Sequence, residues 1–227
     1  MRRVKKIRNY EVGWAGERLV AERLTPLARH GYLIFHDCPA ENHGNIDHIV
    51  VTPTEVYAIE TKTRRKVPSP DPDPPKAEVI YDGQTLIFPH GDEGFGLDQA
   101  RRQARWLSGL LSRHLAEHVS VQPVLGLPGW WVERRGRGDV SVLNPNQLPA
   151  LICERKPIVW NSAAVRRMQQ IEVVLDGLCR DVVFGRSEDP AHIDLREKAK
   201  PQSRPRSPHR QAPRPNTAAR ALDARRN

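Results

Sequence analysis

The sequence predicts a mixed α/β domain, on three observations. Apolar residues recur at helical spacing in three long segments. Short β-branched and apolar runs, bounded by turn residues, lie between the first two of these segments. A further apolar run follows the second segment. The predicted order is therefore a helix, a meander of about three strands, a helix, a strand and a helix. The three predicted helices are residues 11–30, 97–118 and 162–179.

The first predicted helix carries a glycine pair and an acid beside its apolar side. Gly31 follows the helix and is expected to end it. Gly13 and Gly16 lie inside it, although each costs about 1 kcal/mol relative to alanine. Close approach of another backbone explains the pair, and simple tight helix packing is the alternative. Glu17 stands three residues before Val20, so it borders the face that is expected to be buried.

The strands of the first half are predicted from β-branched runs and turn residues. A turn at 42–45 precedes a strand-like run, and Pro53 with Thr54 turns the chain again. An Asp82-Gly83 pair between two apolar runs is a strong hairpin signal. The predicted segments are strands at 32–36, 46–51 and 55–63 and a hairpin at 79–88.

The second half is predicted to alternate between helices and strands. The long helix has an apolar stripe that repeats every three or four residues, and so does the last helix. Between them the predicted elements are strands at 119–127, 130–133 and 139–143 and a short helix at 147–153.

The charge of the chain lies mainly at its ends. The 227 residues carry a formal net charge of +9, of which 1–8 contribute +5 and 186–227 contribute +6, so that the middle is slightly acidic at −2. Residues 186–227 are rich in Pro and Arg and poor in large apolar side chains, so we expect a disordered basic tail. The predicted organisation is a basic N-terminal segment at 1–10, a folded domain at 11–185 and the tail. Inside the domain, 67–75 is expected to form an extended proline-rich loop.

The cysteines and the apolar runs bear on location. Cys38, Cys153 and Cys179 are far apart in sequence and form no Cys-x-x-Cys pair, which argues against a disulfide framework and a zinc ribbon and favours a reducing compartment. No apolar run approaches the roughly 20 residues that span a bilayer. The basic N-terminus lacks the apolar region of a secretory signal. We therefore expect a cytoplasmic protein without a membrane partner.

Two short stretches carry the residue types of a metal-dependent phosphodiesterase. They are Gly-Asn-Ile-Asp-His-Ile-Val-Val at 44–51 and Ile-Glu-Thr-Lys at 59–62. Side chains alternate along a strand, so Glu60 and Lys62 share one face, about 6.6 Å apart. If the two strands pair as a hairpin, Asp47 lies near Glu60. Carboxylates that converge beside a lysine can hold Mg²⁺, which activates a water, while the lysine opposes the charge that develops on phosphate.

These stretches, together with Gly13-x-x-Gly16-Glu17 and Gln99, resemble the nuclease-related domain, or NERD, a branch of the PD-(D/E)XK phosphodiesterase superfamily. The resemblance covers residues 11–127 and implies a restriction-endonuclease-like αβββαβ core. It also implies a metal-dependent endonuclease or phosphodiesterase that hydrolyses DNA by a metal-activated water, with Mg²⁺ or Mn²⁺ as cofactor. The chain departs from the family pattern after Lys62, where a basic stretch and the proline-rich loop are inserted, and before Gln99.

The same resemblance implies a role for each residue. Asp47, Glu60 and the backbone carbonyl of Thr61 are implied metal ligands. Lys62 is the implied catalytic lysine, Glu17 holds metal-associated water, and Gln99 completes the site.

Simpler interpretations stay open. Glu60 and Lys62 can be a solvated ion pair on a strand, and Gln99 can be a surface residue near a helix start. The whole domain can be a nucleic-acid-binding or interaction module without catalysis. Strand preference of the substrate, DNA against RNA, endonuclease against exonuclease action, metal identity and oligomeric state are all left open by the sequence.

Overall fold

The structure is a computed structural model of the chain. It describes residues 2–64, 66, 77–89, 91–154 and 160–179, with the backbone alone for 2–10, 92, 93 and 95. The chain divides into two units after Ser187. The second unit, the tail and the proline-rich loop all lie outside the described residues.

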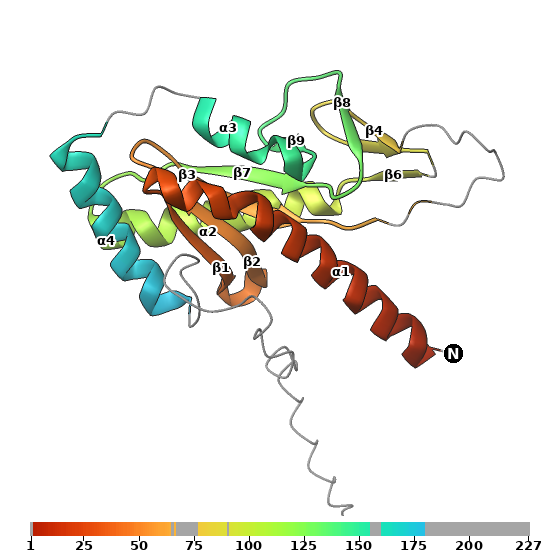
Figure 1. Ribbon diagram of the computed structural model, residues 1–227, viewed down its shortest axis with the longest axis horizontal. Helices are drawn as coiled ribbons and strands as arrows, with labels where there is room; N and C mark the ends of the chain where they lie inside the picture. Colours follow the sequence, from red (N-terminus) through yellow and green to blue (C-terminus); the bar gives the residue numbers. More distant parts are fainter. Residues whose placement is uncertain (1, 65, 67–76, 90, 155–159, 180–227) are drawn as a thin grey trace, which may run out of the picture. The chain divides into compact units, whose positions relative to one another are not determined.

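A five-stranded mixed sheet forms the centre of the first unit (Figure 1). Its strand order is β1-β2-β3-β7-β9, with β1, β2 and β3 antiparallel and with β3, β7 and β9 parallel. The three antiparallel strands form the predicted meander, and the long helix provides the crossover from β3 to β7. The strands are β1 Leu33–Pro39, β2 Asn45–Val51, β3 Val56–Thr61, β7 Val121–Gly126 and β9 Ser141–Leu143.

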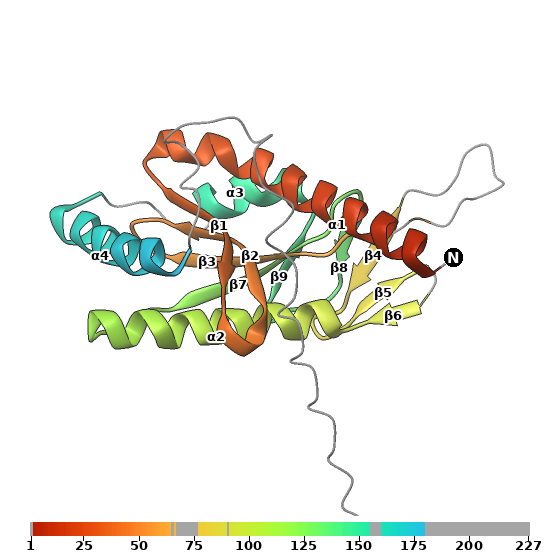
Figure 2. The same ribbon diagram turned by 90° about the horizontal axis from the view of Figure 1, so that it is seen from below.

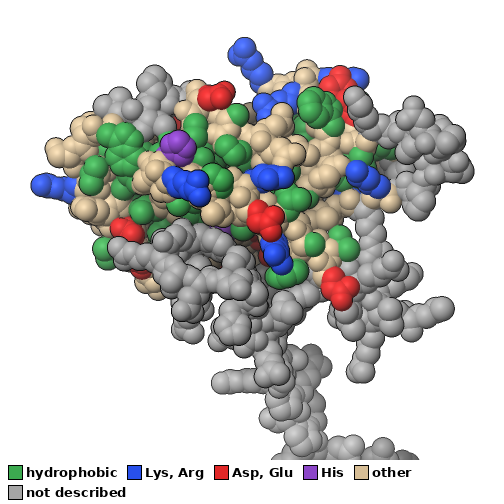
Figure 3. Space-filling model, in the orientation of Figure 1, with side chains coloured by type: hydrophobic (Ala, Val, Ile, Leu, Met, Phe, Trp, Pro, Cys, Tyr) green, Lys and Arg blue, Asp and Glu red, His purple; other side chains and the backbone are tan. Residues whose placement is uncertain are grey.

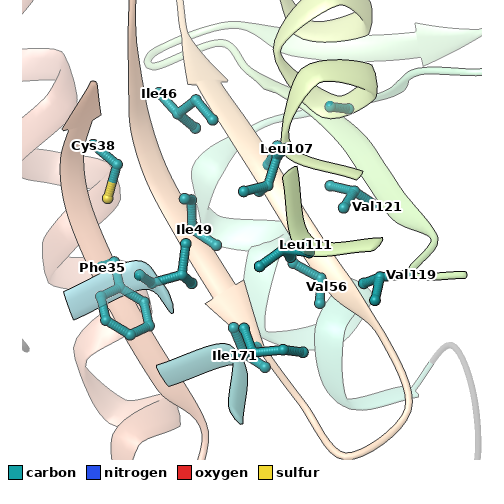
Figure 4. Close-up of a cluster of buried hydrophobic side chains, with 14 of the residues drawn as sticks. Phe35, Cys38, Ile46, Ile49, Val56, Leu107, Leu111, Val119, Val121 and Ile171 are labelled. Atoms are coloured by element: carbon teal, nitrogen blue, oxygen red, sulfur yellow. The ribbon is translucent and has the colours of Figure 1, made fainter. Parts of the chain in front are cut away.

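Helices cover both faces of this sheet, as Figure 2 shows. One buried cluster packs α1 and α3 against the sheet, and another packs α2 and α4 against the opposite face (Figure 4). β3 is buried along its whole length because both of its faces are covered. The helices are α1 Arg2–Leu24, α2 Phe95–Leu115, α3 Leu148–Glu154 and α4 Ser162–Leu178.

A second sheet of four strands was not expected from the sequence. The predicted hairpin forms as β4 and β5, but it continues into a short third strand, and β8 pairs with β4 in parallel. This sheet shares a buried cluster with the start of α2 and the end of β7. Its strand order is β6-β5-β4-β8, with β4 Glu78–Tyr81, β5 Leu86–Phe88, β6 Gly91–Glu93 and β8 Trp131–Arg134.

The first helix is longer than expected at its start and changes type at its end. α1 begins at Arg2, inside the segment that was predicted to be separate. After Leu24 the chain tightens into a 3₁₀ helix, η1 Thr25–His30, where Pro26 has no N–H to continue the α-helical ladder. Gly31 then ends this turn with a φ of 80°, as predicted. The other 3₁₀ turns are η2 Glu41–His43 and η3 Pro145–Gln147.

The expectation of a domain without disulfides is corrected by the structure. Cys38 in β1 is bonded to Cys179, which caps α4, although 141 residues separate them. Both sulfurs lie in the buried cluster under α2 and α4. The bond depends on two elements that pack together, and sequence spacing does not report such packing. Cys153 is the one free cysteine of the described residues.

The charge pattern agrees with the distribution along the chain. On the face shown in Figure 3, basic and acidic side chains are interspersed and form no continuous basic patch. None of the described helices combines the length and the apolar character that a membrane crossing requires.

Candidate active site

Three elements meet at one end of the central sheet. β2 begins there, β3 ends there, and α2 begins beside the end of β3. The antiparallel ladder pairs His48 with Ile59, and one further step along this register places Asp47 opposite Glu60. The predicted hairpin therefore brings the two acids together, on the side of the sheet that faces α2.

Asp47 is fixed by the backbone of the neighbouring strand. Its Oδ2 accepts a hydrogen bond from the N–H of Thr61 at 2.7 Å. Burial raises the pKa of Asp47 well above its usual value, and the nearby charges of Glu60 and Glu17 raise it further. The Thr61 N–H and Lys62 act in the opposite direction but are outweighed. A cation at this point would relieve the repulsion between these carboxylates.

Glu60 is buried, with 2% of its surface exposed. Its Oε1 accepts a hydrogen bond from Lys62 Nζ at 2.5 Å, and its Oε2 is buried without a hydrogen bond from any described residue. Burial raises the pKa of Glu60, although Lys62 partly offsets this. A solvated surface ion pair is excluded by this burial, because surface pairs keep both charges in water.

Lys62 links the end of β3 to the start of α2. Its Nζ donates to Gln99 Oε1 at 2.9 Å as well as to Glu60. Gly96 lets the helix approach the lysine, because a Cβ on Gly96 would lie 3.1 Å from Lys62 Cγ. Gln99 is therefore a partner of the lysine and does not stand apart on the surface.

Glu17 reaches the acid pair electrostatically from α1. Its charge raises the pKa of both Asp47 and Glu60. The adjacent Gly16 explains how α1 comes so close, because a Cβ there would lie 2.0 Å from Thr63 Oγ1. A Cβ on Gly13, by contrast, would meet no described atom within 4 Å. The close approach predicted from the glycine pair is thus correct for Gly16 alone.

Gln103 belongs to the same group, and sequence reasoning gave it no role. It is fully buried, and its Nε2 donates to the backbone carbonyl of Asn45 at 2.8 Å. Its side chain also lowers the pKa of Glu60, and its Oε1 is buried without a hydrogen bond in the described part of the chain. The available signal was its position, one helical turn after Gln99.

The opposite face of the sheet carries a pair of histidines. His48 follows Asp47 in β2 and points to the other face, because side chains alternate along a strand, and its Nδ1 lies 2.6 Å from Nδ1 of His36. Burial lowers the pKa of His36 to about 4. The two histidines therefore belong to the packing on the other face of the sheet and are not part of the acid site.

The donor set suits a hard divalent cation. Two carboxylates face each other, and Lys62 offers a single positive charge against the three acids Asp47, Glu60 and Glu17. Mg²⁺ and Mn²⁺ take a few carboxylate oxygens and complete their shells with water and phosphate. No group of three or more His, Cys, Asp or Glu side chains within the described residues has the geometry of a complete metal site.

The fold and this end of the sheet define a restriction-endonuclease-like α/β core. Comparison with protein families matches residues 12–128 to the nuclease-related domain, which is more than half of the chain. The chain therefore belongs to the nuclease-related domain family. Comparison with curated proteins and with solved structures gave no match.

Proposed function

We propose that this protein is a metal-dependent nuclease that hydrolyses phosphodiester bonds of DNA with Mg²⁺ or Mn²⁺ as cofactor. The observation that carries the proposal is the buried acid pair, Asp47 and Glu60, with the ammonium of Lys62 beside it. Family membership supports a nuclease-related function and an interaction with nucleic acid.

Each residue has a distinct part in this proposal. Asp47, Glu60 and the Thr61 carbonyl hold the cation, which when bound supplies a lowered pKa for water and neutralises charge on phosphate. Lys62 orients the attacking water and opposes the negative charge that develops on the phosphate oxygens. Gln99 and Glu60 keep the Lys62 ammonium in place through two hydrogen bonds. Glu17 accepts hydrogen bonds from the waters that complete the site.

The test is cleavage of labelled DNA by the purified protein with Mg²⁺, with Mn²⁺ and with EDTA. We expect metal-dependent cleavage that falls by at least about 100-fold in Asp47→Ala and Lys62→Ala, the loss typical of a residue that stabilises the transition state. Arg113→Ala is a matched control for Lys62→Ala, because its side chain is exposed and lies near the end of α2 opposite to Gln99. Asp176→Ala is the control acid, because its side chain is exposed on α4 and lies outside the proposed site. Cleavage that persists unchanged in Asp47→Ala would assign the activity to a contaminant.

A second candidate function is a nucleic-acid-binding module without catalysis. The observation that favours it is the lack of a complete metal-ligating side-chain group in the described residues. It predicts salt-dependent binding of DNA, no turnover with either metal, and a DNA affinity that Asp47→Ala does not lower. A metal-dependent cleavage rate that Lys62→Ala abolishes would exclude it.

We further propose that the protein acts in the cytoplasm, where DNA is accessible. The bond between Cys38 and Cys179 bears against this, because disulfides persist mainly in oxidising compartments. Alkylation of thiols at the moment of cell lysis decides the point. Modification of Cys38 and Cys179 together with Cys153 supports a reducing location, and modification of Cys153 alone contradicts it.

A further inference from the structure

Beyond the acid pair, the chain that leaves β3 carries a second charged feature. Lys62 packs its stem against Gly96, and the guanidinium of Arg64 lies over the ring of Phe88 in β5. Thr63 points to the opposite side, against Gly16 in α1. Lys62 and Arg64 therefore contact α2 and β5, whereas Thr63 between them contacts α1.

Arg64 is held by a rigid aromatic support. Its Cζ lies 4.2 Å from the centroid of the Phe88 ring. Phe88 packs edge-to-face against Trp130 with centroids 5.0 Å apart, and Trp130 Nε1 donates to the backbone carbonyl of Arg64 at 3.0 Å. Asn144 in turn donates to the carbonyl of Trp130 at 2.8 Å. Both rings are buried, so both the backbone and the side-chain plane of Arg64 are positioned.

This arrangement fits recognition of a phosphate group. Stacking uses the flat face of a guanidinium, whereas its N–H groups lie at the edge, where they match two phosphate oxygens. Lys66 follows two residues later, with its Nζ 3.9 Å from the Cβ position of Gly129. Lys62, Arg64 and Lys66 thus supply three cations in the stretch that follows Glu60, where the sequence departs from the family pattern.

We propose that Arg64 binds a backbone phosphate of the DNA next to the phosphate that is cut, and so sets how the strand lies across the acid pair. The inference rests on the proposed function for the identity of its ligand. Arg64 acts in binding and positioning, while the chemistry stays with Lys62 and the acids.

The experiment measures binding of fluorescent DNA by anisotropy in EDTA, so that the DNA stays intact, over a range of salt concentrations. We expect Arg64→Gln to weaken binding by about 3–10-fold and to make the slope of log K against log salt shallower by about 0.7–0.9, the value of one lost phosphate contact. Arg113→Gln is the matched control at the far end of α2. It should leave both the affinity and the salt slope nearly unchanged.

Two further variants separate position from charge. Arg64→Lys keeps the charge but loses the planar fork, so we expect weaker binding with a nearly unchanged salt slope. Phe88→Leu removes the ring under the guanidinium and should show the same pattern, with its melting temperature measured to confirm that it is folded. Equal effects of Arg64→Gln and Arg113→Gln, or no effect of Arg64→Gln, would overturn the inference.

The outcome is distinguishable from that of the proposed function. Metal-dependent cleavage by the wild type, combined with binding that is indifferent to Arg64, overturns the inference alone. Binding that depends on Arg64, combined with no cleavage by the wild type under any metal, supports the inference and overturns the proposed catalysis. A wild type that does not bind DNA at low salt overturns both.

Discussion

Asp47 and Thr61 are joined by a hydrogen bond of 2.7 Å from the Thr61 N–H to the Asp47 carboxylate. The bond ties the first acid to the backbone that carries Glu60 and Lys62. A shift of β2 against β3 would therefore separate the two acids and, at the same time, break the hydrogen bond between Thr61 and Asp47. The geometry of the acid pair is in this sense a property of the strand register.

The metal-free site should be a source of instability that Asp47→Asn relieves. The pKa of Asp47 is raised in the folded protein, so the folded state favours the neutral acid. Its contribution to stability is present below the unfolded pKa of about 3.9 and is lost as the pH rises through the folded pKa. Asparagine keeps an acceptor for the Thr61 N–H and cannot ionise.

In EDTA at pH 8, we therefore expect Asp47→Asn to melt above the wild type, with about 2–4 °C for each kcal/mol gained. The difference should shrink as the pH approaches 4. Asp176→Asn removes an exposed acid of α4 and should shift the melting temperature little at any pH. A lower melting temperature for Asp47→Asn at pH 8 would contradict the picture of mutual repulsion.

Metal binding should stabilise the folded state through the same acids. A ligand at 100 times its Kd adds about 2.7 kcal/mol to the free energy of unfolding. We expect Mn²⁺ or Mg²⁺ to raise the melting temperature of the wild type and to leave that of Glu60→Gln almost unchanged. Glu172→Gln, which changes an acid of α4 outside the proposed site, is the matched control. An equal rise in Glu60→Gln would place the metal elsewhere.

The two glycines of α1 should respond oppositely to alanine. Gly16→Ala places a Cβ 2.0 Å from Thr63 Oγ1, and such overpacking costs about 1–3 kcal/mol. Gly13→Ala meets no described atom and gains up to about 1 kcal/mol of helix propensity. Chemical denaturation of both variants tests this. Adding Thr63→Ala to Gly16→Ala should recover most of the loss, and no recovery would indicate a different source of strain.

Gln103 should matter for activity through Asn45. Gln103→Leu removes the donor to the Asn45 carbonyl just before Asp47, at a cost of about 1 kcal/mol in the free energy of unfolding. We expect a fall in cleavage of about 10-fold or more, together with a smaller rise of the melting temperature on adding Mn²⁺. Gln170→Leu on the exposed side of α4 is the control. Full activity in Gln103→Leu would leave Gln103 a purely structural residue.

His36 should make the protein sensitive to acid. Its pKa falls from 6.5 to about 4 on burial, so the unfolded state binds more protons between these values. The folded state therefore loses stability as the pH falls from 6.5 towards 4, by roughly 3 kcal/mol in total. Denaturation at pH 7.5 and 4.5 should show a smaller loss for His36→Gln than for the wild type. His30→Gln, which changes an exposed histidine, is the control and should lose as much stability between the two pH values as the wild type. An equal loss in His36→Gln would show that His36 is not the source of the acid sensitivity.

The parts of the fold that sequence predicts are those set by local pattern. Alternation along β3 placed Glu60 and Lys62 on one face, and the short turn between β2 and β3 brought Asp47 opposite Glu60. The end of η1 at Gly31 followed from its freedom to adopt positive φ. These features depend on residues that are close in sequence.

The parts that sequence missed depend on distant partners. The parallel pairing of β8 with β4 joins strands about 50 residues apart, and no local pattern indicates it. The bond between Cys38 and Cys179 arises in the same way. Gln103 was not predicted as a site residue, because an amide on the apolar face of a helix gives the same sequence pattern whether it supports packing or a functional site. The start of α1 at Arg2 was missed although Val4, Ile7 and Tyr10 recur at helical spacing, because the five basic residues around them led to the prediction of a separate basic segment.

The bond between Cys38 and Cys179 also has a topological consequence. It closes a covalent ring that contains β2, β3 and α2, and hence Asp47, Glu60, Lys62 and Gln99. A single proteolytic cut anywhere inside that ring leaves one molecule until a reductant is added. Glu17 alone among the proposed site residues lies outside the ring, so only a cut between Glu17 and Cys38 can detach part of the site without breaking the disulfide.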